Sequence, residues 1–183
     1  FVPGETSELP PPISQKESLY VDFAAGTKEG LDFITPEVSK VELTTKMGVG
    51  CLALYPQRGD VSEDGLAFQI KDKDYFRDKE KVLVCIDYFD MGSNRLYFNH
   101  IDQYGTKQQI PITKLGDAQW KRAIIQLEKD SFTQRASLYL GSDFYLDASM
   151  WAGRMYHDNL FISRIILKGF NEEQTQLFSQ YDK

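Results

Sequence analysis

The chain has 183 residues, of which 42% are hydrophobic and 26% charged, which excludes a collagen-like or wholly disordered protein. The formal net charge of -6 argues against nucleic acid as a partner, because phosphate binding requires a surplus of Lys and Arg. The sequence has no apolar run of about 18 residues, so we expect no membrane-spanning segment.

The first sixteen residues have the composition of a linker. Four of the seven prolines of the chain fall within the first twelve residues. Proline has no amide hydrogen and favours the extended polyproline conformation. We therefore expect residues 1–16 to form a Pro-rich linker to an anchor or a neighbouring module, and residues 17–183 to form a single domain.

Beyond the linker, the hydrophobic pattern alternates with a period of two residues or forms short apolar runs between turn residues. This pattern predicts strands at 18–23, 41–46, 51–55, 66–70, 82–88, 95–100, 108–112, 120–127, 137–146 and 160–167. The succession predicts an all-β fold, a two-sheet antiparallel β-sandwich of the jelly-roll type. One short C-terminal helix is expected at residues 171–180, where Asn171 suits the N-cap position.

Two strand patterns carry further information. Residues 82–89 are apolar on both faces, which predicts a central strand of a sheet. Four tyrosines lie on one face of their predicted strands, with apolar residues on the opposite face: Tyr88, Tyr97, Tyr139 and Tyr145. These rings would form an aromatic platform if their strands are neighbours. The alternative is ordinary packing at the sheet surface with the hydroxyls reaching water.

The connection before the last predicted strand is long, and long ordered loops in compact domains are usually functional. It carries Trp151, Arg154 and Tyr156, with Asp147 and Asp158 near its ends. An exposed indole ring suits the apolar face of a pyranose, and the charged groups can orient sugar hydroxyls through hydrogen bonds. Trp151, Arg154 and Tyr156 are therefore the first candidate glycan site. The alternative is that Trp151 folds inward onto the core.

Tyr97, Tyr139 and Asp143 are the second candidate binding group. Acidic side chains lie at residues 60–64 and near strand ends. They are either solvated surface acids or ligands of a structural calcium ion. We expect no other cofactor. Cys51 and Cys85 have no metal-binding spacing. They are either two buried thiols or one disulfide.

Catalytic signatures are scarce in this sequence. It contains no nucleophile elbow, phosphate-binding glycine loop or zinc-binding histidine motif. A glycosidase needs two nearby carboxylates, and Asp87 and Asp90 are the nearest candidates. Asp87 lies in a predicted strand and Asp90 in the turn after it, where Asp is common for structural reasons. We therefore expect the chain not to be an enzyme.

Six segments of the chain, taken in order, resemble a sequence pattern that recurs in one protein family. They are residues 81–92, 95–99, 120–123, 131–135, 142–145 and 158–165. The pattern resembles the galactose-binding-like jelly-roll accessory modules of bacterial glycoside hydrolases and polysaccharide-processing lipoproteins. The resemblance implies a non-catalytic carbohydrate-binding domain beside a catalytic domain, secreted, periplasmic or anchored at the cell surface. The alternative is a structural or protein-interaction module without sugar binding.

Overall fold

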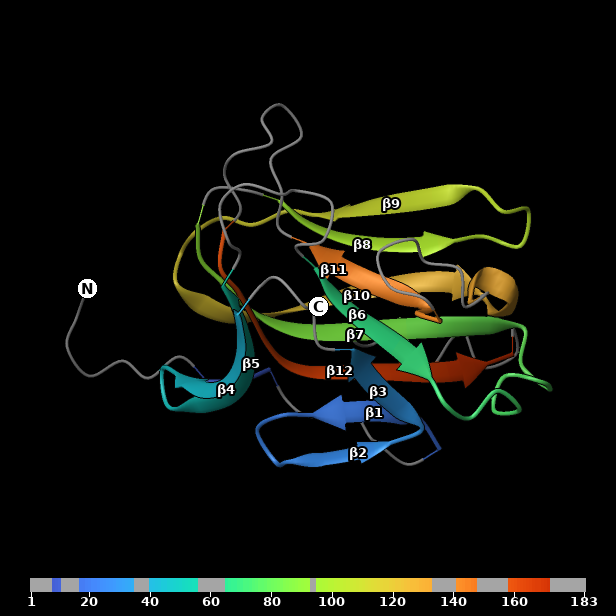
Figure 1. Ribbon diagram of the computed structural model, residues 1–183, viewed down its shortest axis with the longest axis horizontal. Helices are drawn as coiled ribbons and strands as arrows, with labels where there is room; N and C mark the ends of the chain where they lie inside the picture. Colours follow the sequence, from blue (N-terminus) through green and yellow to red (C-terminus); the bar gives the residue numbers. More distant parts are fainter. Residues whose placement is uncertain are drawn as a thin grey trace.

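The computed structural model describes residues 8–10, 17–34, 40–55, 65–92, 95–132, 141–147 and 158–171. Within these ranges, seven strands form one antiparallel sheet and five form another (Figure 1). The two sheets lie face to face and enclose the main hydrophobic core. This confirms the predicted all-β, two-sheet jelly-roll sandwich.

The long strand β12 organises the larger sheet, because it pairs with β7 along one edge and with β5 and then β1 along the other. The seven-stranded sheet contains β10 (Gln119–Glu128), β7 (Lys81–Asp90), β12 (Leu160–Phe170), β1 (Leu19–Asp22), β2 (Thr27–Glu29), β4 (Lys40–Lys46) and β5 (Val49–Tyr55). The five-stranded sheet has the order β3 (Leu31–Ile34), β6 (Leu66–Ile70), β11 (Phe144–Asp147), β8 (Leu96–Ile101) and β9 (Lys107–Ile112).

Aromatic rings from adjacent strands of the five-stranded sheet form the centre of the core. The Phe144 ring lies between those of Phe68 and Phe98, with centroid distances of 5.1 Å and 5.0 Å. All three side chains are fully buried. Val84 and Ile86 of β7 belong to the same core from the opposite sheet. Such burial of large apolar side chains is the main source of stability for the sandwich.

Strand β7 is central, as its two-sided pattern predicts, because it lies between β10 and β12. Its inward residues join the main core, whereas Leu83 and Cys85 pack in a smaller cluster on the outer face of the sheet. Tyr88 faces the main core, so the prediction that it belongs to a surface platform of tyrosines is wrong. Cys51 and Cys85 are both free, buried thiols, and burial raises their pKa values to about 11 and about 12.

Some predicted elements differ from those observed. Within the described part of the expected strand over residues 137–146, the strand begins at Phe144, because Gly141 adopts a positive φ of 86° within a turn. Residues 133–140 lie outside the described part of the chain, as do residues 172–183 with nearly all of the expected helix. The sequence pattern missed β2 and β3, which are only three and four residues long. No helix in the described ranges has the length and apolar character needed to cross a bilayer.

Two residues of the expected linker contact the outer face of the seven-stranded sheet. The Arg164 guanidinium donates a hydrogen bond of 2.9 Å to the carbonyl oxygen of Pro10. Leu9 packs against a buried cluster that includes Trp120 and Phe161. Leu9 and Pro10 therefore pack against the domain.

Candidate functional site

The outer face of the five-stranded sheet carries polar and aromatic side chains. Along β8, Leu96 and Phe98 point into the core, so Tyr97 and Asn99 point to the other face. The same alternation on β11 places Tyr145 and Asp147 outward. The register sets Tyr97 opposite Asp147 and Asn99 opposite Tyr145, so all four side chains are neighbours. We call this group, with Lys107 described below, the outer-face site.

Asn99 is at the centre of the outer-face site and is completely buried. Its Nδ2 atom donates a hydrogen bond of 3.1 Å to Oδ2 of Asp147 and lies 3.4 Å and 3.5 Å from two backbone carbonyl oxygens. Its Oδ1 atom accepts no hydrogen bond in the described part of the protein. A buried acceptor without a donor costs about 1–3 kcal/mol, and most buried polar groups of native proteins avoid that cost.

A positive charge lies beside these groups. The Lys107 ammonium, from the neighbouring strand β9, is 5.6 Å from the centre of the Tyr145 ring. Lys107 is exposed, whereas Tyr97 and Tyr145 are only 6% and 4% exposed. The site thus combines a free acceptor, a carboxylate, an ammonium and two phenol rings. This set can both donate hydrogen bonds to a polyhydroxylated ligand and accept them.

Of the residues expected at the binding sites, the structure describes Tyr97 and Asp143, and it does not bring these two together. Tyr97 belongs to the outer-face site, although its ring is buried rather than openly exposed. Asp143 lies immediately before β11, the central strand of the sheet, and its carboxylate accepts hydrogen bonds of 2.8 Å from the Ile70 amide and the Lys73 ammonium. Asp143 is 1% exposed. Its hydrogen bond with the Ile70 amide links the end of β6 to the start of β11.

The remaining candidates, Trp151, Arg154, Tyr156 and Tyr139, lie outside the described residues. The residues on either side of the segment that carries the first three are described. Asp147 ends β11 within the outer-face site. The segment thus begins at the outer-face site.

At its other end, Asp158 is held in place. Its carboxylate accepts a hydrogen bond of 2.9 Å from the Lys114 ammonium, whose side chain is 3% exposed. Gly92, with a φ of 84°, makes room for this carboxylate, because a Cβ at that position would approach it to 2.3 Å. Both ends of the connection are therefore fixed by buried or partly buried polar contacts.

The sequence pattern did not point to Asn99 or Lys107, and it placed Asp147 near one end of the long connection before the last strand. Asn is disfavoured in strand interiors, and Asn99 interrupts an otherwise apolar and aromatic strand. That interruption was the available signal. The position of Lys107 over Tyr145 depends on strand order and had no signal in the sequence.

The two carboxylates considered for glycoside hydrolysis do not face each other. Asp87 and Asp90 are three residues apart on β7, so they project to opposite faces of the sheet. Asp87 forms ion pairs of 2.7 Å with Arg122 and Arg164. Asp90 accepts hydrogen bonds from Lys121 and from two backbone amides. Burial alone would raise the pKa of Asp90, but these hydrogen bonds outweigh it and lower the pKa.

The acids considered for calcium are dispersed. Among the described residues, no three His, Cys, Asp or Glu side chains gather in a geometry that could hold a metal ion. Asp143 and Asp158 are each paired with a lysine, and residues 60–64 lie outside the described ranges.

Comparison with known proteins gives structural similarities only. No protein-family model matches the chain, and no curated protein matches it. Solved structures of carbohydrate-binding modules resemble it. One is the xylan-binding CBM22-1 domain of Paenibacillus barcinonensis Xyn10C, with 16% identity, 84% of this chain and 94% of that chain covered, and a TM-score of 0.47.

Two further similar structures are also modules of this type. The family 29 module CBM29_1 from Piromyces equi has 8% identity, with 90% of this chain and 98% of that chain covered and a TM-score of 0.46. The family 11 module from Clostridium thermocellum, in complex with a β-1,3-1,4-mixed-linked tetrasaccharide, has 16% identity, with 85% and 97% covered and a TM-score of 0.44.

Proposed function

We propose that this domain is a non-catalytic carbohydrate-binding module that holds a glycan against the outer face of the five-stranded sheet. The observation that carries the proposal is Asn99, whose buried Oδ1 atom has no donor among the described residues. A sugar hydroxyl is a donor of the required kind. It would satisfy this oxygen and recover the free energy that the unpaired acceptor costs.

The neighbouring groups of the outer-face site complete the recognition chemistry. Asp147 accepts hydrogen bonds from hydroxyls, and Lys107 donates to ring or hydroxyl oxygens. Trp151, Arg154 and Tyr156 follow directly after β11, and we propose that they add a stacking surface and further hydrogen bonds. Each hydrogen bond contributes about 1 kcal/mol net, so we expect dissociation constants in the micromolar to millimolar range.

We propose that the domain acts outside the cytoplasm beside a carbohydrate-active enzyme, which it would keep near its polysaccharide. The competing role as a protein-interaction module would need a contiguous apolar surface. The exposed large hydrophobic side chains of the described residues are scattered instead. Leu43 on β4 and Ile124 on β10 lie at opposite edges of the seven-stranded sheet, and Tyr104 and Leu115 follow different strands of the other sheet.

A binding screen with matched variants tests the proposal. The isolated domain is tested by affinity electrophoresis against soluble xylan, mannan, mixed-linkage glucan and pectin, and by depletion onto insoluble cellulose. Calorimetry then measures the affinity for each polysaccharide retained. We expect Asn99→Ala to weaken binding about five- to tenfold, through the loss of one or more hydrogen bonds.

The matched control is Asn171→Ala, because Asn171 also has a buried Oδ1 without a partner in the described residues but follows β12, outside the outer-face site. It should leave binding unchanged. A second pair compares Trp151→Ala, expected to reduce binding strongly, with Tyr104→Ala, at an 84% exposed position on the β8–β9 turn. Equal effects within either pair, or no retention by any glycan, would contradict the proposal.

A further inference from the structure

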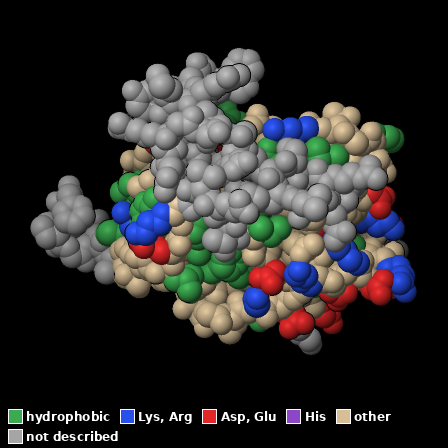
Figure 2. All heavy atoms as spheres, viewed as in Figure 1, with side chains coloured by type: hydrophobic (Ala, Val, Ile, Leu, Met, Phe, Trp, Pro, Cys, Tyr) green, Lys and Arg blue, Asp and Glu red, His purple; other side chains and the backbone are tan. Residues whose placement is uncertain are grey.

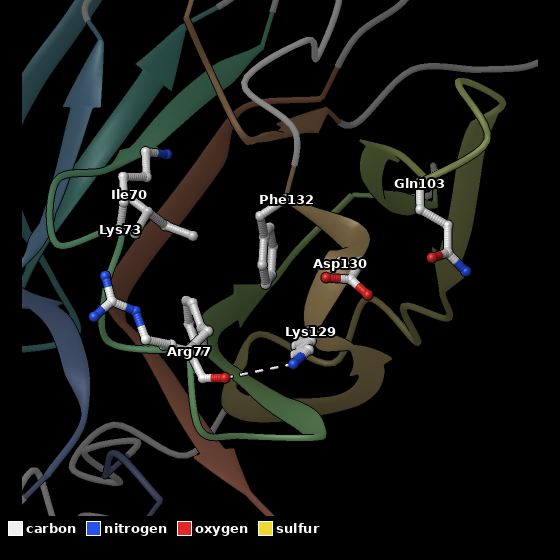
Figure 3. A pocket seen from close by; sticks show the side chains of 8 residues that line it. Ile70, Lys73, Arg77, Gln103, Lys129, Asp130 and Phe132 are labelled. Atoms are coloured by element: carbon white, nitrogen blue, oxygen red, sulfur yellow. Dashed lines mark hydrogen bonds between the residues drawn. The ribbon is translucent and has the colours of Figure 1, made fainter.

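A recess lies at one end of the sandwich, between the connection that follows β6 and the 3-10 turn η1 (Lys129–Ser131) that follows β10 (Figure 3). Its volume is about 610 Å³, which is within the usual range of ligand pockets. Its described lining residues are Ile70, Lys73, Phe76, Arg77, Gln103, Lys129, Asp130 and Phe132. None of them belongs to the outer-face site. We call this recess the end pocket.

The lining of the end pocket has more cationic than acidic side chains, although the whole chain is acidic. Three cationic side chains and one carboxylate line it, whereas the chain carries a net charge of -6. Figure 2 shows charged side chains of both signs gathered at the end of the sandwich where β6 ends. The cationic excess is therefore a local feature of the pocket.

The three cations differ in the ion pairs and hydrogen bonds that they form within the protein. Lys73 forms a 2.8 Å ion pair with the buried Asp143. Arg77 pairs with a neighbouring exposed carboxylate, and its guanidinium points away from Phe132 at the pocket rim (Figure 3). Lys129 is half-buried, and its described hydrogen bond is a long one of 3.4 Å to the carbonyl oxygen of Arg77. Lys129 is thus the cation with the most donor capacity left for a ligand.

An aromatic pair stands beside Lys129. The rings of Phe76 and Phe132 are stacked, with centroids 5.7 Å apart and an interplanar angle of 28°. Phe76 is buried in the core, whereas Phe132 is partly exposed and its ring stands between the two walls of the pocket (Figure 3). A partly exposed ring offers a flat apolar surface to a ligand.

We propose that the end pocket binds a hexuronate, a sugar unit that carries one carboxylate. Lys129 would bind the carboxylate through a charge-assisted hydrogen bond, and the C–H face of the sugar would lie against Phe132. Asp130 and Gln103 would bind the hydroxyls. The carboxylate of Asp130 repels phosphate and other multiply charged anions, so the mixture of charges favours a ligand with one negative group and several hydroxyls.

Titration of the whole domain with sodium glucuronate, followed by amide NMR shifts, tests the proposal. We expect saturable shifts at residues 70–77 and 129–132 with a millimolar dissociation constant, and no binding of glucose over the same range. Added NaCl at about 0.5 M should weaken binding, because salt screens the partly exposed charges. Lys129→Gln should weaken binding about tenfold, and Lys129→Arg should retain it.

Two controls separate this site from the outer-face site. Lys28→Gln, at an exposed lysine on β2, and Asn99→Ala should both leave glucuronate binding unchanged. Unfolding temperatures of all variants check that each is folded. Absence of saturable shifts, equal binding by Lys129→Gln, equal binding of glucose, or binding of triglutamate in place of glucuronate would each overturn the proposal. None of these results would affect the proposed function, which rests on Asn99.

Discussion

The outer faces of the two sheets bury polar groups in opposite ways. On the seven-stranded sheet, Asp87 is 1% exposed, and both of its oxygens accept hydrogen bonds of 2.7–2.9 Å from Arg122 and Arg164. On the five-stranded sheet, Asn99 is 0% exposed, but only its Nδ2 atom is used by the described residues. Both groups lie mid-strand and point away from the main core.

This difference separates a structural polar group from a candidate binding group. A buried ion pair with all its hydrogen bonds made holds adjacent strands in register, here β10, β7 and β12. An acceptor such as Asn99 Oδ1, which no donor of the described residues reaches, adds nothing to the fold there, so a ligand donor is the better candidate partner. Saturation of hydrogen bonds, more than burial or a mid-strand position, distinguishes Asp87 from Asn99.

The largest expected effect comes from breaking the saturated face. Asp87→Asn would leave two nearly buried guanidinium groups without their carboxylate, so we expect the free energy of unfolding to fall by about 3–5 kcal/mol. Urea denaturation measures it. The control is Asp74→Asn, which removes an exposed ion pair with Arg77 and should change stability by less than about 0.5 kcal/mol. A folded Asp87→Asn protein that lost glycan binding would break the distinction between the faces.

A smaller effect is expected from the inner face of the five-stranded sheet, where His100 is buried. Burial lowers the pKa of His100 below 6.5, although its hydrogen bond with the Ser131 carbonyl acts in the opposite direction. The unfolded chain therefore binds a proton more readily than the folded one, and stability falls as the pH drops below about 6.5, by at most about 1.4 kcal/mol per pH unit.

Urea denaturation at several pH values between 7 and 5 measures this dependence. The matched variant is His100→Gln, which removes the titrating ring and should flatten the slope in that range. An unchanged slope in the variant would show that another group is responsible.

The smallest expected effect is on stability at the unsaturated face. Asn99→Leu loses the 3.1 Å hydrogen bond to Asp147 but also removes the unsatisfied oxygen. These contributions are each about 1 kcal/mol and oppose each other, so we expect the free energy of unfolding to change by at most about 1 kcal/mol. A loss of 3 kcal/mol or more, comparable to that of Asp87→Asn, would show that Asn99 is structural.

The sequence determined most of the strands and, within each strand, which side chains share a face. Alternation with a period of two is a local property, so it correctly placed β7 at the centre of a sheet with Val84 and Cys85 on opposite sides. It could not show that Tyr88 faces the core while Tyr97 does not, because both belong to apolar patterns of similar strength. The turn at Gly141 was also missed, since an apolar pattern continues across it.

Tertiary structure alone decided which side chains meet. Asn99 and Asp147 are 48 residues apart, and they meet because β8 pairs with β11 in one register. A shift of one residue would move each of them to the opposite face. The end pocket likewise joins the connection after β6 to the turn after β10, elements that belong to different sheets. Strand order and register are set by packing of the whole core, which no local pattern in the chain encodes.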